Sequence, residues 1–217
     1  MEQPIQAYWN IKLKELKERL EKNNFEVYIA ESVARMQEVV LQTILAKLSP
    51  RSISWGGSMT FTGSGLYNIL KDRTDITVLN TFEKTTSPEK LLEIRRNALL
   101  TDLFITGTNA VTEDGQLVNL DMIGNRIAGL TFGPRHVIVL VGRNKVVRDL
   151  EEAMVRVKDY AAPANAMRLD KKTPCTKTAT CHECSSPDRI CNTWTITEKS
   201  YPKGRVHIVL VNQDLGL

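Results

Sequence analysis

The sequence predicts an α/β fold in which helices cover both faces of a mostly parallel sheet. Short apolar segments typical of strands alternate along the chain with segments whose apolar residues recur at helical spacing. The strand-like segments, such as residues 137–141, are apolar throughout, which is typical of parallel strands buried on both faces. Of the 217 residues, 42 % are hydrophobic and 25 % are charged, a globular composition in a chain long enough to form its own core.

Residues 1–50 are interpreted as an N-terminal helical segment that packs on the α/β domain. Apolar residues spaced for one face of a first helix are Trp9, Leu13, Leu16 and Leu20. A second helix is expected from about Glu31 to Leu48, where Ser49-Pro50 would end it. The α/β domain is placed at residues 51–217 and includes a cysteine-rich loop at 170–192.

Strands and helices then alternate through the domain. Strands are predicted at 52–55, 76–79, 103–106, 136–141, 193–196 and 206–211, and helices at about 59–70, 88–99, 122–130 and 149–160. Ser87-Pro88-Glu89 is a strong helix start, because it combines a side-chain cap, a proline in the first turn and an acid near the positive helix end. Residues 111–121 predict a hairpin added to the sheet, with its turn at Asp114-Gly115.

Small and polar residues follow several of the predicted strands, at the edge where open α/β sheets bind ligands. Glycines there let the main chain approach an anion closely, while hydroxyls and the first amides of a following helix supply hydrogen-bond donors. We therefore expect a small anionic metabolite to bind, with a carboxylate, a phosphate or a thioester. The candidate ligand-binding residues are Gly56, Gly57, Ser58, Met59, Thr60, Thr106, Gly107, Thr108, Asn109, Asn125, Arg126 and Gly133.

Each of these segments has a simpler interpretation, in which its glycine only serves a tight turn. None of them matches a phosphate-binding P-loop or a dinucleotide fingerprint. No nucleophile–base arrangement can be recognised either. Asp102, Asp114 and Asp121 are the candidate acids or bases, and the histidines on predicted strands, His136 and His207, are expected to be satisfied structural residues.

All four cysteines lie in one loop, at the spacing Cys175-x5-Cys181-x2-Cys184-x6-Cys191. Disulfides would join distant parts of the chain, whereas this clustering favours a metal or cluster site. The spacing is nearly the reverse of that in the iron–sulfur loop of some DNA-repair glycosylases, so a [4Fe-4S] cluster is the preferred cofactor. Zinc is the alternative, redox-active or unliganded cysteines are a third interpretation, and His182 could replace one thiolate.

The net charge of +4 is small against 29 basic and 25 acidic residues, which are interspersed. A nucleic-acid-binding protein would usually be more basic and more segregated, so nucleic acid is not expected as a partner. The N-terminal residues do not resemble a secretory signal, and the apolar runs are too short for a membrane helix. We therefore expect a cytoplasmic protein that does not associate with membranes.

Several segments together resemble the LUD domain, the lactate-utilisation family that was formerly a domain of unknown function. They are 56–60 (GGSMT), 101–110 (TDLFITGTNA), 125–128 (NRIA), 133–139 (GPRHVIV), 142–147 (GRNKVV) and the C-terminal 209–216. The resemblance covers most of the chain and implies an α/β fold of the sugar-isomerase and CoA-transferase type. The chain is similar to short stand-alone members, and it lacks the repeated CxxCxxC motifs of the long, cluster-rich member.

The resemblance implies a component or accessory of bacterial L-lactate oxidation to pyruvate, with an iron–sulfur redox partner protein. Because the sequence has no nicotinamide or flavin motif, electron transfer would depend on the cysteine loop or on that partner. Two alternatives stay open. One is a CoA-transferase- or isomerase-like enzyme, for which Glu113 would be the acyl-accepting glutamate; the other is a zinc-stabilised module that binds a small ligand.

Overall fold

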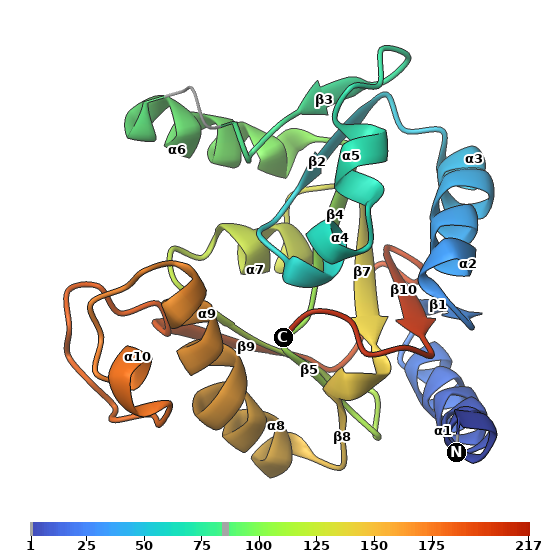
Figure 1. The fold of residues 1–217 in the computed structure, drawn as a ribbon. Coiled ribbons are helices and arrows are strands. Elements are labelled where there is room, and N and C mark those ends of the chain that lie inside the picture. The colour runs from blue at the N-terminus through green and yellow to red at the C-terminus, as the bar shows by residue number, and fades with distance from the viewer. Residues whose placement is uncertain (1, 84–86) are drawn as a thin grey trace.

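A sheet of parallel strands forms the centre of the molecule (Figure 1). The structure is a computed structural model that describes residues 2–83 and 87–217. Within these residues the main sheet has six strands, in the order β1-β10-β7-β4-β2-β3. They are β1 (Glu26–Ala30), β2 (Ser52–Trp55), β3 (Thr77–Leu79), β4 (Leu103–Gly107), β7 (His136–Gly142) and β10 (Val206–Val211). Every neighbouring pair is parallel, which confirms the predicted fold class.

One face of this sheet is covered by helices from the first third of the chain. They are α2 (Val33–Glu38), the π-helical turn η1 (Val39–Ile44), α3 (Leu45–Leu48), α4 (Met59–Gly63) and α5 (Leu66–Leu70). Their buried side chains, such as Met36 and Phe61, share one hydrophobic core with Ile138 and Leu140 of β7. The sequence predicted α4 and α5 as a single helix, but the chain breaks at Gly65, which has a φ of +76°.

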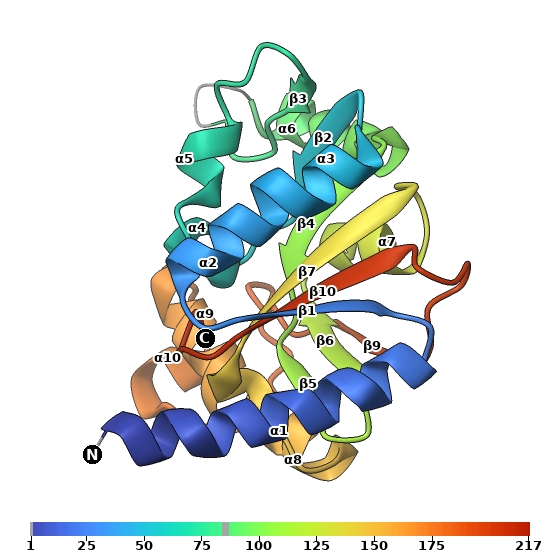
Figure 2. The same ribbon diagram turned by 90° about the vertical axis from the view of Figure 1, so that its right-hand side faces the viewer.

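The opposite face is covered by α1 (Glu2–Lys22) and α7 (Asn125–Thr131), so that α1 and α2–α3 lie on opposite sides of the sheet (Figure 2). Leu13, Leu16 and Leu20 of α1 pack there against Val137 and Val139 of β7. Since side chains alternate across a strand, β7 contributes to both cores. This arrangement confirms helices on both faces of the sheet.

A second, smaller sheet lies against the α1 face, with strands in the order β8-β5-β6-β9. These strands are β5 (Ala110–Thr112), β6 (Leu117–Asp121), β8 (Val146–Val147) and β9 (Thr193–Thr197). β5 and β6 form the predicted antiparallel hairpin, in which Gly115 has a φ of +86°. The sequence predicted this hairpin as an addition to the main sheet, whereas it pairs with β8 and β9 to form a sheet of its own.

The remaining helices lie before β4 or after β7 in the chain. They are α6 (Pro88–Asn97), the short turns η2 (Ala98–Leu100) and η3 (Arg143–Lys145), α8 (Leu150–Arg156), the π-helical turn η4 (Val157–Ala161), α9 (Ala162–Arg168) and α10 (Cys175–Thr178). The helix predicted to end at Tyr160 continues to Arg168. Pro163 lacks an amide donor, and the wider π-helical turn that precedes it lets the helix continue past this residue.

The N-terminal segment contributes a strand as well as helices. β1 pairs with β10 along its whole length, from Glu26 opposite His207 to Ala30 opposite Val211. The sequence predicted only helices within residues 1–50 and missed this strand. Residues 1–50 therefore supply an edge of the main sheet in addition to helices that pack on both of its faces.

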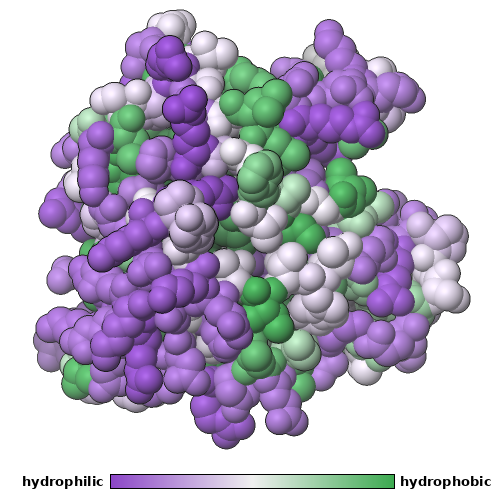
Figure 3. All heavy atoms as spheres, turned by 180° about the vertical axis from the view of Figure 1, so that it is seen from behind, coloured by the Kyte–Doolittle hydropathy of each residue, from purple (hydrophilic) through white to green (hydrophobic). Residues whose placement is uncertain are grey.

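The surface of the molecule mixes polar and apolar side chains. Figure 3 shows the rear face, where apolar groups are small and are separated by hydrophilic ones. This pattern agrees with the interspersed charges of the sequence. Among the described residues, no helix has the length and apolar character needed to cross a membrane.

Candidate functional site

A cavity of about 420 Å³ lies at the carboxyl ends of β2 and β4. This is the edge at which open α/β sheets bind ligands. Gly57, Ser58 and Met59 follow β2 on one side of the cavity, and Gly107, Thr108 and Asn109 end or follow β4. Further parts of the wall come from the segment after β3, from β6, α6, α7, η3 and α9, and from the cysteine-rich loop. A volume of this size suits a small metabolite.

Eight of the twelve predicted ligand-binding residues line this cavity: Gly57, Ser58, Met59, Gly107, Thr108, Asn109, Asn125 and Arg126. Gly56, Thr60 and Thr106 belong to the same segments but do not reach its surface. Gly133 lies at the opposite end of the sheet, before β7, and packs on Leu99. The structure therefore brings the predicted segments together, apart from the one at Gly133.

The two strand ends approach each other closely because Gly107 has no side chain. A Cβ on Gly107 would lie 2.5 Å from the hydroxyl oxygen of Ser58. That hydroxyl accepts a hydrogen bond of 3.2 Å from the amide of Phe61 and so caps α4. α4 spans only five residues, so it supplies little helix dipole, and the charge of the cavity must come from side chains.

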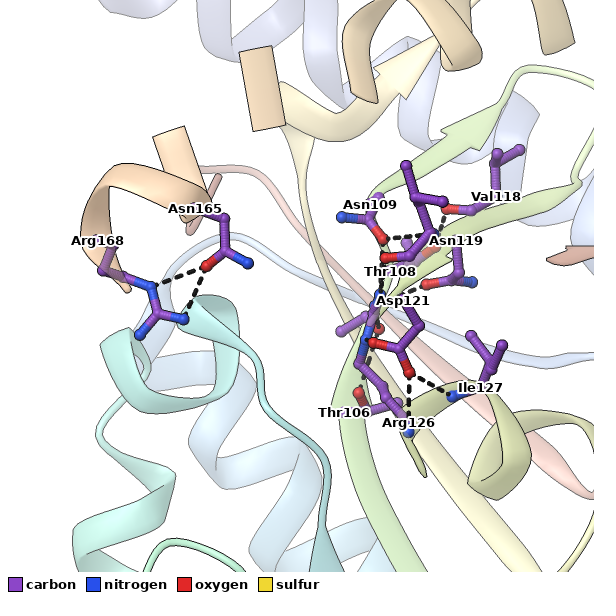
Figure 4. Close-up of polar contacts among 12 residues, drawn as sticks. Thr106, Thr108, Asn109, Val118, Asn119, Asp121, Arg126, Ile127, Asn165 and Arg168 are labelled. Atoms are coloured by element: carbon purple, nitrogen blue, oxygen red, sulfur yellow. Dashed lines mark hydrogen bonds and ion pairs between the residues drawn. The ribbon is translucent and has the colours of Figure 1, made fainter. Parts of the chain in front are cut away.

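Arg126 is the centre of a hydrogen-bond network on the polar side of the cavity (Figure 4). Its guanidinium is almost completely buried, and it donates four hydrogen bonds, to Asn119 Oδ1 (2.8 Å), Gly107 O (3.3 Å), Asn109 Oδ1 (2.7 Å) and Leu120 O (3.0 Å). Asp121 is its ion-pair partner at 3.5 Å, and this carboxylate also accepts from the amides of Arg126 and Ile127. Arg126 thus ties β4, β6 and α7 into one unit.

Further cations face the same space from other elements. Arg95 of α6 lines the cavity, and among the described residues it has no hydrogen-bond or ion-pair partner. Among the described residues, Arg168 donates only to the side-chain oxygen of Asn165, at 2.7 and 2.9 Å, and Figure 4 shows this pair across from the Arg126 group. Lys171 also lines the cavity.

The cavity is strongly electropositive. Five of its described lining residues have basic side chains, namely Arg95, Arg126, Lys145, Arg168 and Lys171. Asp121 is the only carboxylate side chain among the described lining residues. This excess of positive charge favours a ligand that carries negative charge.

Lys145 is a second buried basic residue that lines the cavity. It follows β7 in the turn η3, and only 4 % of the residue is exposed. Its Nζ donates to Thr60 Oγ1 at 2.6 Å and to the carbonyl oxygen of Thr108 at 2.9 Å. Burial, followed by the charges of Arg156 and Arg126, lowers the pKa of Lys145 to about 7.

The cysteine-rich loop forms a second, much smaller cavity of about 20 Å³ beside the first. Its lining includes all four cysteines, His182 and two cations, Lys158 and Arg189. The thiols are free, and among the described residues no three cysteine, histidine or carboxylate side chains are close enough together to hold a metal ion. The side chains are therefore of the types that bind metal ions, but they are not close enough together to form a coordination site. Ile190 lines both cavities, so the loop is a shared wall.

Comparison with known proteins assigns the family. The LUD domain family matches this sequence over residues 13–211. The chain belongs to the LUD domain family. Among solved structures, this LUD domain is similar to a DUF162 family protein from Deinococcus radiodurans, with a TM-score of 0.51 and 14 % identity. The similarity covers 94 % of this chain and 98 % of that one, and at this identity it concerns the fold. No curated protein matches the chain.

Several cavity residues of this LUD domain were missed by sequence reasoning. Lys145 lies in the segment GRNK directly after a predicted strand. Because open α/β sheets bind ligands at the carboxyl ends of their strands, this position could have marked it as a candidate. Arg95, Asn165 and Arg168 lie on helices that the sequence does not place near the strand ends, and no sequence signal marks them.

The candidate acids and bases outside the cavity have structural partners. Asp102 lies at the amino end of β4 and accepts hydrogen bonds from the amides of Arg51 and Ser52 at 3.0 and 3.2 Å. Asp114 is exposed in the hairpin turn, 3.7 Å from Arg19. Of the three aspartates proposed from the sequence, Asp121 lines the cavity.

Proposed function

We propose that this LUD domain binds a small carboxylate in its strand-end cavity, as a component or accessory of 2-hydroxy-acid oxidation such as that of L-lactate to pyruvate. The single observation behind the proposal is the excess of basic side chains in the cavity, where the described lining residues include five basic side chains and one carboxylate side chain, that of Asp121. Membership of the LUD domain family supports the choice of a 2-hydroxy or 2-oxo acid. A cavity of about 420 Å³ is of the size expected for a small metabolite.

The CoA-transferase alternative has less support. Its candidate acyl acceptor, Glu113, lies beside the hairpin turn and accepts a hydrogen bond of 2.7 Å from Lys12 of α1. Glu113 does not line the cavity, and none of the described lining residues is a glutamate. A transfer mechanism that needs a glutamate nucleophile therefore has no candidate at this site.

A thermal-shift screen tests the proposed ligand class. L-lactate, pyruvate, a sugar phosphate, inorganic phosphate and CoA would each be added to the full chain. The proposal predicts that L-lactate or pyruvate raises the melting temperature, because a ligand that binds only the folded state stabilises it. A rise with the sugar phosphate or with CoA alone would favour an isomerase- or transferase-like function and contradict the proposal.

We further propose that the cysteine-rich loop holds a [4Fe-4S] cluster, with zinc as the alternative. The support is that all four thiols and His182 border one small cavity, whose lining also includes two cations, Lys158 and Arg189, that would offset thiolate charge. Cys175, Cys181, Cys184 and Cys191 would be the ligands. When bound, such a cluster would supply one-electron transfer, whereas zinc would only stabilise the loop.

Anaerobic purification with metal analysis and a visible absorption spectrum tests the loop. Iron, sulfide and visible absorption that are lost in Cys184→Ala would support a cluster. Zinc in equal amount to the chain, without iron, would support the structural alternative. A protein that contains neither metal after anaerobic reconstitution would contradict both.

A further inference from the structure

The amine of Lys145 has an environment that favours its neutral form. Both of its hydrogen-bond acceptors, Thr60 Oγ1 and the carbonyl oxygen of Thr108, are uncharged. A buried ammonium is usually compensated by a carboxylate, but none of the described carboxylates is its partner. The nearby charged groups are instead the guanidinium groups of Arg126 on α7 and Arg156 on α8, which repel a further positive charge.

The hydrogen bonds also leave one position of this amine unused. A neutral amine has two N–H bonds and one lone pair, and the two N–H bonds of Nζ are taken by Thr60 and Thr108. Among the described residues no third group is hydrogen-bonded to Nζ, and Lys145 lines the cavity. A desolvated lysine beside other cations, with a free lone pair, is the arrangement that makes lysine a nucleophile toward carbonyl compounds.

We propose that Lys145 forms a covalent imine with the carbonyl carbon of a 2-oxo acid bound in the strand-end cavity. The inference rests on the proposed function, because it assumes that the cavity binds the product side of 2-hydroxy-acid oxidation. It goes beyond that function by assigning a covalent step to a named residue.

The step balances without an oxidant or a reductant. The lone pair of Nζ attacks the carbonyl carbon, and a C–N bond forms as the C=O π bond opens to a carbinolamine. Both amine protons leave with the former carbonyl oxygen as water, and the C=N double bond remains. The carboxylate of the 2-oxo acid would lie toward Arg95 and Arg168, the lining guanidinium groups that have no carboxylate partner among the described residues.

Thr60 is not an alternative nucleophile. Its side chain is completely buried, it does not line the cavity, and its hydroxyl donates to the carbonyl oxygen of Leu215 at 3.3 Å. The competing explanation is that Lys145 only ties the end of β7 to α4 and to the segment after β4. A structural lysine of that kind would bind no carbonyl compound, so a covalent assay separates the two explanations.

Reductive trapping with cyanoborohydride tests the inference directly. The full chain would be incubated with pyruvate and sodium cyanoborohydride, digested, and analysed by mass spectrometry of its peptides. We expect a reduced pyruvyl adduct on Lys145. L-lactate should give no adduct, because it has a hydroxyl group in place of the ketone. The yield should rise with pH through about 7, as the amine loses its proton.

Two variants and a binding measurement complete the experiment. Lys145→Met should lose the adduct, while Lys203→Met, which changes an exposed lysine outside the cavity, should retain it. If Lys145→Met does not fold, the position of the adduct in the wild-type peptide map still decides the question. Pyruvate that raises the melting temperature of the wild type but leaves no adduct on Lys145 would overturn the imine and leave the proposed function intact. Absence of binding by any carboxylate would overturn both.

Discussion

At the scale of single residues, His207 is a buried histidine whose ring lacks a hydrogen-bond partner. It is 1 % exposed in β10, and among the described residues neither ring nitrogen has a hydrogen-bond partner. The sequence predicted a structural histidine whose ring nitrogens have hydrogen-bond partners. The structure places the ring in the core, but it shows no such partners among the described residues. Burial, together with the charges of His136 and Lys47, lowers the pKa of His207 to about 4, although Glu26 at 3.7 Å opposes this shift.

This buried ring predicts a pH dependence of stability. Below pH 6.5 the unfolded chain takes up a proton on His207 that the folded protein cannot hold until about pH 4. The free energy of unfolding should therefore fall as the pH falls through this window, by up to about 1.4 kcal/mol per pH unit. Denaturant unfolding at a series of pH values between 6.5 and 5 measures this slope.

His207→Phe is the matched variant, since a phenyl ring can stack on Tyr28 and needs no hydrogen bond. Its slope should be smaller than that of the wild type, and part of the slope should remain because burial also lowers the pKa of His136. Equal slopes in the two proteins would contradict this explanation.

The residues of the site could be predicted in part from the sequence. Gly57, Ser58 and Gly107–Asn109 follow predicted strands, and the strand-end rule placed them correctly at one edge of the sheet. Arg95 and Arg168 are ordinary helix-surface arginines in the sequence, and they reach the cavity only because of how α6 and α9 are arranged in space. The hydrogen bonds of Lys145 could not be foreseen, since Thr60 and Lys145 are 85 positions apart.

At the scale of elements, the junction between the ends of β2 and β4 determines the shape of the cavity. Gly57 and Gly107 both line it, but they have different surroundings. A Cβ on Gly107 would lie 2.5 Å from Ser58 Oγ, while a Cβ on Gly57 would meet no heavy atom within 4 Å. Both glycines belong to segments that the sequence marked, but only the structure distinguishes a close approach from open space.

Gly107→Ala and Gly57→Ala are a matched pair of substitutions at this junction. Gly107→Ala should lower the free energy of unfolding by about 1–3 kcal/mol, because the added methyl group displaces Ser58 from its cap on α4. Gly57→Ala should change it by less than about 0.5 kcal/mol. Denaturant unfolding of both variants measures the difference, and equal losses would show that the contact with Ser58 is not the cause.

Elements with strong local signals were predicted well. The helix that begins at Ser87-Pro88 is confirmed, with Ser87 accepting a hydrogen bond from the amide of Lys90. β1 was missed because its partner, β10, lies about 180 positions further along the chain, and a short edge strand has little local pattern. The separate hairpin sheet was missed for the same reason, since β6 finds its second partner only in β9.

At the scale of the whole molecule, the cavity exists because distant segments meet at one edge of the sheet. Its walls include the segments after β2, β3 and β4, parts of β6, α6, α7, η3 and α9, and the cysteine-rich loop. The fold class followed from the alternation of strands and helices, but the composition of this wall depends on strand order and helix docking. The cysteine-rich loop is also more than a candidate metal site at this scale. Through Ile190, which lines both cavities, it forms part of the wall of the proposed ligand site.

Calorimetric titration of pyruvate and L-lactate into the wild type, Arg95→Ala and Arg96→Ala is the most direct test of the electropositive cavity. Arg95 lines the cavity without a partner among the described residues, while its neighbour Arg96 lies outside the cavity and pairs with Glu93. We predict that Arg95→Ala weakens binding at least about tenfold, the effect of losing one charge-assisted hydrogen bond, and that Arg96→Ala leaves the affinity unchanged. Equal affinities of Arg95→Ala and the wild type, or no binding of either acid to the wild type, would contradict the account.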